Sequence, residues 1–256
     1  MTHTPLHLLD LRFDLPGLWR AVRHDGKALA DADLGYAVHA ALFAALGPDH
    51  APKPFALQPM LPGARQLRVL GYSLHAAPDL LAARPRAMAD GALVHLDSKP
   101  LPEPSQWRVG QRLQFSVRAR PTVRGHKISP DGKERDLELD AYHAEVRHAG
   151  IDSAKSREEV YVAWLDKQFA NLGGAALAHC RLDGWQLAPV YRKGTPVLGS
   201  LQARRGTRLM TLPEAEFSGE LTVSDGTGFH ALLGRGIGRH RAFGHGMVLV
   251  RRAAAA

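Results

Sequence analysis

The order of predicted strands and helices restricts the fold of this chain more than any other feature, because it is nearly the same in both halves. Each half reads strand, helix, strand, strand, helix, strand. That order is the ferredoxin-like, or split βαβ, arrangement. The two halves show no sequence similarity to each other, so the repeat rests on element order alone. We predict an α+β protein with two tandem ferredoxin-like domains, at residues 1–103 and 104–256.

The first half opens with an apolar segment, about residues 6–13, that predicts a strand. A helix follows, because Asp31 or Asp33 can cap its start and Gly47-Pro48 stops it. Its apolar side chains recur at helical spacing and predict the buried face: Leu34, Val38, Ala41, Leu42 and Ala45. Residues 48–63 hold five prolines and are expected to form a loop or an irregular edge. The other elements expected here are a strand at 66–74, a short helical piece within 77–89, a strand at 93–96 and a proline-rich linker at 99–104.

The second half opens with a strand predicted over residues 112–123, where apolar and polar side chains alternate. Ser156 and Glu159 form a capping box for a helix that reaches Leu172 and stops at Gly173-Gly174. The other elements expected here are a polar turn or loop at 125–132, short strands near 179–190, 195–203 and 217–223, a helix at 228–233 and a final strand at 247–251.

Positive charge is concentrated in the second half of the chain. The net charge is +8, and residues 1–100 carry 10 basic and 9 acidic side chains, whereas residues 101–256 carry 23 and 16. Two stretches, 104–130 and 226–256, hold no acidic residue at all. Segregated positive charge favours a polyanionic partner such as RNA through counterion release. The alternative is a solvated basic surface without a partner.

Several classes of protein are disfavoured by what the sequence lacks. No apolar run approaches the roughly 20 residues of a membrane span, and the start of the chain does not resemble a signal peptide. We therefore expect a cytoplasmic protein without a membrane partner. The single cysteine, Cys180, excludes an internal disulfide and a cysteine-rich zinc site. The chain has no H-E-x-x-H, no carboxylate cluster at ligand spacing and no G-x-S-x-G elbow, so we expect no metal and no cofactor.

A glycine- and arginine-rich segment, 234–252, is the first candidate for binding. Its five glycines leave the backbone open to a ligand, and the arginines and histidine between them add charge. The spacing G-x-G-x-G differs from the dinucleotide fingerprint G-x-G-x-x-G, and a Walker loop would need a lysine followed by serine or threonine. The segment therefore favours a grip on an RNA backbone. Glycines required for a tight turn and for sheet packing are the alternative.

Tyr36 and His39 are the candidates for acid–base chemistry. They lie three residues apart on the predicted helix, off its apolar stripe and next to each other on one face. A histidine can take or give a proton near neutral pH, and a neighbouring phenol can orient it. The chain has 14 histidines, so spacing alone singles out none of them. The alternative is a histidine that only packs or faces solvent.

Several segments together carry a resemblance to one family. They are the run from Phe229 to Val250, the strand-like 217–225, the basic 118–127 with Gly132-Lys133, the helix from Trp164 to Gly174, and Tyr36-x-x-His39. These segments resemble the CRISPR repeat-RNA endonucleases of the RAMP superfamily. The CasE-like enzymes of type I-E systems and the similar processing enzyme of type IV systems are the subfamilies with the most similar motifs.

The resemblance implies a metal-independent endoribonuclease that cuts precursor CRISPR RNA within the repeat. The ribose 2′-OH would attack the phosphate and leave a 2′,3′-cyclic phosphate and a 5′-OH. His39 would act as general base or acid, and Tyr36 would position it or the ribose. The candidates for the group that stabilises the developing phosphorane charge are Arg23, Lys27 and Arg241.

The implied partners are the CRISPR repeat hairpin RNA, which the enzyme keeps as mature crRNA, and the subunits of a Cascade-like effector complex. The residues expected to bind RNA are Arg23, Arg118, Arg120, Arg124, His126, Lys127, Lys133, Gly234, Arg235, Gly236, Gly238, Arg239, His240, Arg241, Gly244 and Gly246.

Two departures from the family pattern fall in the RNA-holding region. The usual Ala-Asn-Pro-Thr reads Ala-Arg-Pro-Thr at 119–122, and the usual Gly-Lys-Arg reads Gly-Lys-Glu at 132–134. The repeat bound by this chain is therefore expected to differ from that of the type I-E enzymes. Two other functions stay open: a non-catalytic subunit that binds the crRNA repeat, and a small-molecule or nucleotide enzyme that uses the glycine-rich loop.

Overall fold

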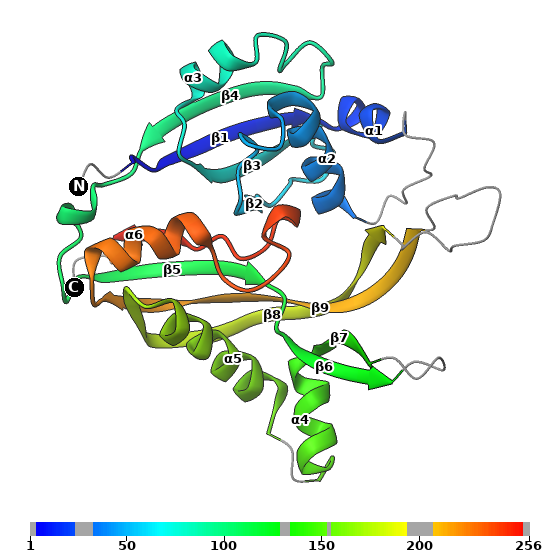
Figure 1. Ribbon diagram of the computed structural model, residues 1–256, viewed down its shortest axis with the longest axis vertical. Helices are drawn as coiled ribbons and strands as arrows, with labels where there is room; N and C mark the ends of the chain where they lie inside the picture. The colour runs from blue at the N-terminus through cyan, green and yellow to red at the C-terminus, as the bar shows by residue number, and fades with distance from the viewer. Residues whose placement is uncertain (1–3, 24–32, 129–133, 153–154, 194–206, 253–256) are drawn as a thin grey trace.

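Two four-stranded antiparallel sheets form the body of the protein, one above the other in Figure 1. The structure, a computed structural model, describes residues 4–23, 33–128, 134–152, 155–193 and 207–252. No helix within these ranges combines the length and the apolar character that a membrane span requires.

The first sheet has the strand order β2-β3-β1-β4. Its strands are β1 (His7–Asp14), β2 (Phe55–Leu57), β3 (Gln66–Ser73) and β4 (Leu93–Pro100), and its helices are α1 (Leu15–Arg23), α2 (Leu34–Leu46) and α3 (Ala77–Ala83). Leu9, Leu11 and Phe13 alternate along β1 and are fully buried, as the period of a strand with one covered face requires. The predicted linker at 99–104 is partly wrong, because β4 continues through Pro100 and pairs with β1.

The second sheet has the equivalent order β10-β5-β9-β8. Its strands are β5 (Arg112–Ala119), β8 (Ala175–Lys193), β9 (Thr207–Val223) and β10 (Leu249–Arg252). Helices α5 (Arg157–Leu172) and α6 (Gly226–Arg235) accompany it, with the short 3-10 turns η1 (Pro104–Gln106) and η2 (Arg241–Phe243). In both sheets the first strand of the unit lies between the third and the fourth, which is the ferredoxin-like order. The predicted α+β fold with two ferredoxin-like units is confirmed.

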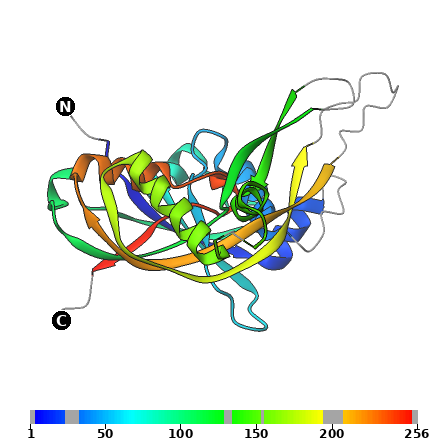
Figure 2. The ribbon, with the colours of Figure 1, turned by 90° about the horizontal axis from the view of Figure 1, so that it is seen from below.

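An insertion separates β5 from α5 in the second unit. It consists of β6 (Thr122–Ile128), β7 (Glu134–Asp140) and α4 (Ala141–Ala149), and Figure 2 shows the β6–β7 hairpin projecting from the body. The predicted single strand over 112–123 is therefore wrong, because β5 ends at Ala119. The turn or loop predicted over 125–132 is wrong at 125–128, which belong to β6, and its remainder lies outside the described residues. The chain leaves the second sheet at Arg120-Pro121, where proline has no N–H to donate to a ladder. The strand expected at 195–203 lies outside the described residues.

The base of the hairpin is fixed to α5 by buried polar groups. Tyr161 Oη donates to Asp140 Oδ1 over 2.9 Å, and Arg157 Nη1 donates to Asp140 Oδ2 over 2.8 Å. Trp164 Nε1 donates to the carbonyl oxygen of Thr122 over 3.1 Å. The capping box of Ser156 and Glu159, predicted from the sequence, starts this helix. The hairpin therefore leaves the body from a rigid support.

The two sheets share part of one hydrophobic core. Leu6, Ala56 and Tyr72 of the first half are buried in the core that consists mainly of second-half residues. The hydroxyl of Tyr72 donates to the carbonyl oxygen of Val248 over 2.8 Å. Burial raises the pKa of this phenol far above its usual value, so it stays a hydrogen-bond donor.

Candidate functional site

Helix α2 places Tyr36 and His39 on the edge of its buried face. Asp33 caps the helix, since its Oδ1 accepts a hydrogen bond from the amide of Tyr36 over 2.9 Å. Val38 and Leu42 are buried in the core beneath, whereas Tyr36 and His39 are half-buried. The helix and its cap were predicted from the sequence, and the two candidate side chains lie off the apolar stripe as expected.

Phe243 of η2 packs against both candidate side chains. Its ring lies parallel to that of Tyr36, with 6.2 Å between centroids and 5° between planes. The ring of His39 is tilted against it, with centroids 4.8 Å apart. His39 also contacts Phe43, one turn further along α2, at 4.9 Å. Rings at these spacings attract each other and restrict each other's rotamers.

A glycine in the first turn of α2 makes this contact possible. A Cβ at Gly35 would lie 2.2 Å from the carbonyl oxygen of Phe243. No side chain fits in that space, so only glycine lets the backbone of η2 approach the helix. Residues from opposite ends of the chain thus form one compact site. Phe243 could not be predicted as part of this site, because nothing in its local sequence distinguishes it from a core phenylalanine.

The glycines of the segment after α6 have a structural role of their own. Gly236, Gly238, Gly244 and Gly246 all have positive φ angles. A Cβ at Gly246 would lie 2.0 Å from the carbonyl oxygen of Ile237. Tight turns and close packing, the alternative considered from the sequence, therefore account for much of this glycine pattern. The predicted RNA contacts of these glycines stay predictions, as does that of Gly234, the penultimate residue of α6.

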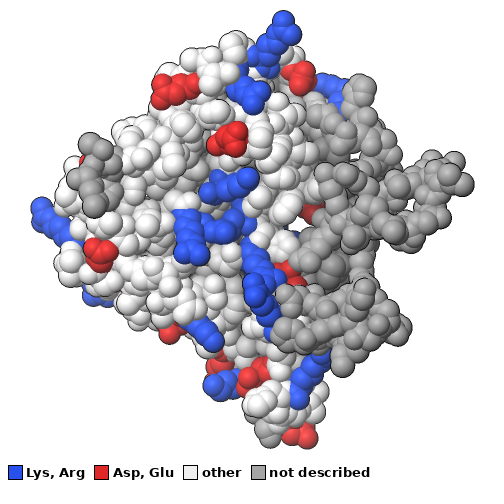
Figure 3. Space-filling view, in the orientation of Figure 1, with Lys and Arg blue, Asp and Glu red and all other residues white. Residues whose placement is uncertain are grey.

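The arginines of the same segment present charge to solvent. Arg235 and Arg239 are exposed, and the half-buried Arg241 donates from Nη1 to the carbonyl oxygen of Arg235. Figure 3 shows lysine and arginine side chains gathered in a band across the middle of one face, where Figure 1 places the end of α6 and the segment that follows. This band lies beside η2 and therefore beside Tyr36 and His39.

Glu138 ties the glycine-rich segment to the hairpin. Its buried carboxylate on β7 lies 3.0 and 3.1 Å from His240 Nε2 and 3.9 Å from Arg239 Nη1. Thr122 Oγ1 donates to the same carboxylate over 2.8 Å. His240 adopts a left-handed conformation with φ 61°, which the contact with Glu138 helps to hold. The two segments that the sequence predicts to hold RNA are thus joined by an acid that the sequence did not single out.

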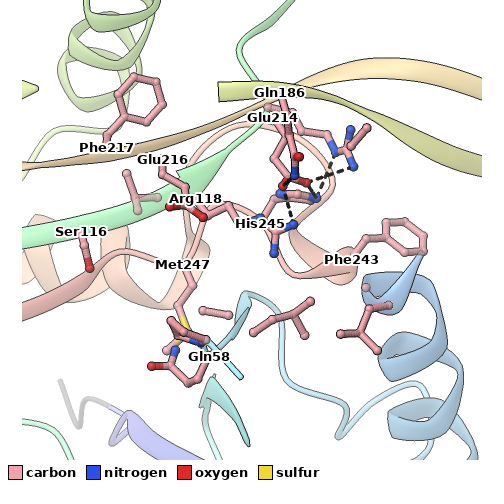
Figure 4. A pocket seen from close by; sticks show the side chains of 18 of the residues that line it. Gln58, Ser116, Arg118, Gln186, Glu214, Glu216, Phe217, Phe243, His245 and Met247 are labelled. Carbon is pink, nitrogen blue, oxygen red and sulfur yellow. Dashed lines mark hydrogen bonds and ion pairs between the residues drawn. The ribbon is translucent and has the colours of Figure 1, made fainter. Parts of the chain in front are cut away.

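A second buried network lies in the cleft between the sheets. Arg120 is 4% exposed, its Nε donates to His245 Nε2 over 3.0 Å, and its Nη2 lies 3.6 Å from Glu214 Oε2. Arg118 also pairs with Glu214, and Figure 4 shows Arg118, Glu214 and His245 converging. They line a cleft of about 930 Å³. Burial, together with the charges of Arg120 and Arg118, holds the pKa of His245 well below its usual range.

Arg120 is therefore buried among protein partners, whereas a direct contact with RNA needs a side chain that is exposed to solvent. Among the other predicted RNA-binding residues, Arg118 is half-buried and Arg124 is exposed on β6. Lys27 and Lys133, and the side chains of Arg23, His126 and Lys127, lie outside the described part of the chain. Within that part, no three histidine, cysteine or carboxylate side chains are placed to hold a metal ion.

Sequence comparison identifies the family. The pattern of the family described as CRISPR associated protein matches residues 18–252. The chain belongs to the CRISPR-associated protein family. No curated protein sequence matches this CRISPR-associated chain.

Solved structures with the same fold include three from CRISPR systems. CRISPR endoribonuclease Cse3 bound to 19 nt RNA has a TM-score of 0.60 at 19% identity, with 96% of this chain and 99% of that one covered. Cas6e from Escherichia coli K-12 gives 0.52 at 16% identity, with coverage of 96% and 100%. A chain of a CRISPR RNA-guided surveillance complex gives 0.54 at 15% identity, with the same coverage. At these identities the likeness establishes the fold of the CRISPR-associated chain.

Proposed function

We propose that this chain is a metal-independent endoribonuclease that cuts precursor CRISPR RNA within its repeat. His39 and Tyr36 carry this proposal, because a potential acid–base pair lies against η2, beside the exposed arginines of the glycine-rich segment. The family supports it, as does the fold shared with a CRISPR endoribonuclease bound to RNA.

The reaction needs only groups of the RNA and of the protein. The ribose 2′-oxygen bonds to phosphorus, and the bond from phosphorus to the 5′-oxygen breaks. His39 takes the proton of the 2′-OH or supplies one to the leaving 5′-oxygen, a contribution of about 10²–10⁴ in rate. Tyr36 positions His39 or the ribose. The products are a 2′,3′-cyclic phosphate and a 5′-OH.

The negative charge that develops on the phosphorane needs a cation nearby. Arg241 begins η2, and its guanidinium is held near the site by its bond to the Arg235 carbonyl. Arg23 and Lys27 are the other candidates. A cation that stabilises the transition state should affect the cleavage rate more than the affinity for uncut RNA.

The RNA hairpin would lie along the β6–β7 hairpin and the glycine-rich segment, with phosphate contacts from residues such as Arg124, Arg235 and Arg239. Arg120 would act indirectly, by holding Glu214 and His245 in the cleft. The enzyme would keep the mature crRNA and join a Cascade-like complex. A chain of this fold in a CRISPR RNA-guided surveillance complex supports that role.

Cleavage of a labelled repeat RNA tests the proposal. We expect cleavage in EDTA, a cyclic phosphate on the 5′ fragment, and no cleavage when the ribose at the cut site is 2′-deoxy. His39→Ala should abolish cleavage and retain binding, whereas the control His148→Ala, an exposed position on α4, should cut normally. A requirement for magnesium would disprove the mechanism. Binding without cleavage by the unaltered protein would make the chain a non-catalytic crRNA-binding subunit.

A further inference from the structure

A basic pocket lies between the loop after α2, the end of β3 and α6. It has a volume of about 490 Å³ and is lined by His50, Lys53, His75 and His230, with Asp49 as the one carboxylate among its lining residues. The rings of His50 and His75 lie 4.9 Å apart at an angle of 58°. Nothing in the mechanism above uses this pocket.

A continuous row of side chains connects the pocket to His39. The ring of Phe43 lies 4.9 Å from that of His39, and Lys53 Nζ lies 5.1 Å from the centroid of Phe43. Phe43 is 37% exposed, so part of its ring is open to solvent. Lys53 belongs to the lining of the pocket, so Phe43 and the pocket form one surface.

We propose that Phe43 and this pocket bind the single-stranded nucleotide that follows the scissile phosphate of the RNA. The inference rests on the proposed function and adds a binding site for the unpaired RNA next to the hairpin. Phe43 offers a flat ring on which a base can stack, and Lys53 beside it offers a charge for the adjoining phosphate. This pairing of aromatic and basic groups is how proteins bind single strands.

The chemistry of the pocket fits a nucleotide. Its volume lies in the range of small-molecule sites, about 300–1,000 Å³, and is too small for a double helix. His50 Nδ1 is a buried atom with no hydrogen-bond partner among the described residues, so it can bond to a base or a ribose. Three histidine rings offer hydrogen-bond donors and acceptors to a base or a ribose, and Lys53 offers a positive charge to a phosphate.

The position of the pocket indicates that its ligand is the unpaired flank of the RNA and not the RNA hairpin. In Figure 1, α6 lies well away from the β6–β7 hairpin, and the segment that follows α6 runs from it toward the side of the molecule on which the hairpin lies. RNA held by β6–β7 would pass η2 and His39 before it reached Phe43. The nucleotide in the pocket is therefore the one on the far side of the cut.

Two uncleavable RNAs, both 2′-deoxy at the cut site, test this inference by fluorescence anisotropy. One ends at the scissile phosphate, and the other continues as a short unpaired flank. We expect the flank to tighten binding about tenfold, the contribution of one stacked base. Phe43→Leu with His75→Asn should remove this gain and leave the affinity for the shorter RNA unchanged. The control Lys167→Gln, an exposed position on α5, should bind both RNAs like the unaltered protein.

Two results would overturn the inference. One is a flank that adds nothing to binding by the unaltered protein. The other is a double variant that loses affinity equally for both RNAs while its melting temperature is unchanged. If the melting temperature of the double variant is lowered, Lys53→Gln, a change at an exposed position, takes its place in the same experiment. Failure of the proposed function would show separately, as the absence of cleavage of unmodified repeat RNA.

Discussion

The ring of Phe243 lies parallel to the ring of Tyr36, with 5° between their planes, and the same ring contacts His39. Phe243 is the last residue of η2, directly after the arginines of the C-terminal segment. Tyr36 and His39 lie in the first two turns of α2. One side chain thus lies between the candidate RNA-binding surface and the candidate acid–base pair. A shift of this ring would therefore change the surroundings of both Tyr36 and His39.

Phe243→Leu should slow cleavage more than it weakens binding. Loss of the flat ring leaves Tyr36 and His39 free to change rotamer, and small misplacements of catalytic groups cost about 10- to 100-fold in rate. Single-turnover cleavage at saturating RNA measures the rate, and anisotropy with 2′-deoxy RNA measures the affinity. Phe243→Tyr, which keeps the ring, should restore the rate. An unchanged rate in Phe243→Leu would show that the ring contacts do not position the pair.

Gly35→Ala should destabilise the protein and reduce cleavage together. The added Cβ would lie 2.2 Å from the carbonyl oxygen of Phe243, so α2 and η2 must move apart. Overpacking of this kind costs about 1–3 kcal/mol of unfolding free energy. Urea unfolding measures the loss. Gly184→Ala is the matched control, because a Cβ there meets no atom within 4 Å. Equal stabilities for the two variants would contradict the close packing of α2 on η2.

His245 should make the folded state sensitive to mild acid. Its folded-state pKa lies well below 6.5, so the unfolded chain binds the proton first as pH falls. The stabilisation is complete above pH of about 6.5 and is lost progressively below it, by up to about 1.4 kcal/mol per pH unit. The unfolding free energy, measured in urea between pH 7.5 and 5.5, should decline less steeply in His245→Gln. Identical slopes would show that His245 binds its proton equally in the folded and unfolded states.

Arg235→Ala and Arg239→Ala should weaken RNA binding and flatten its dependence on salt. Each lost phosphate contact lowers the slope of log affinity against log salt by about 0.7–0.9. Anisotropy titrations over a range of potassium chloride concentrations give these slopes. Arg86→Ala, exposed on the turn before β4, removes the same charge elsewhere and should leave the slope unchanged. If the unaltered protein and the three variants showed the same dependence of affinity on salt, the RNA would bind to another surface.

The fold could be predicted from local patterns, whereas the contacts of the site could not. Alternation along 112–119 and helical spacing along 34–46 depend on neighbours in sequence, and both elements are present in the structure. The burial of Arg120 depends on partners far along the sequence, His245 and Glu214. The contacts of Phe243 with α2 and of Glu138 with His240 likewise join distant segments. A periodic sequence pattern cannot indicate such contacts, because each contact forms only when the two sheets have formed.

The hydrogen bond from Tyr72 to Val248 bears on how the protein can be divided. A fragment that stops before β5 would expose Leu6, Ala56 and Tyr72, and the complementary fragment would expose the apolar surface that covers them. Each fragment alone is therefore expected to aggregate. Co-expressed, they should find each other and restore a soluble heterodimer, so that fusing a split fluorescent reporter to the two fragments would report their assembly in living cells.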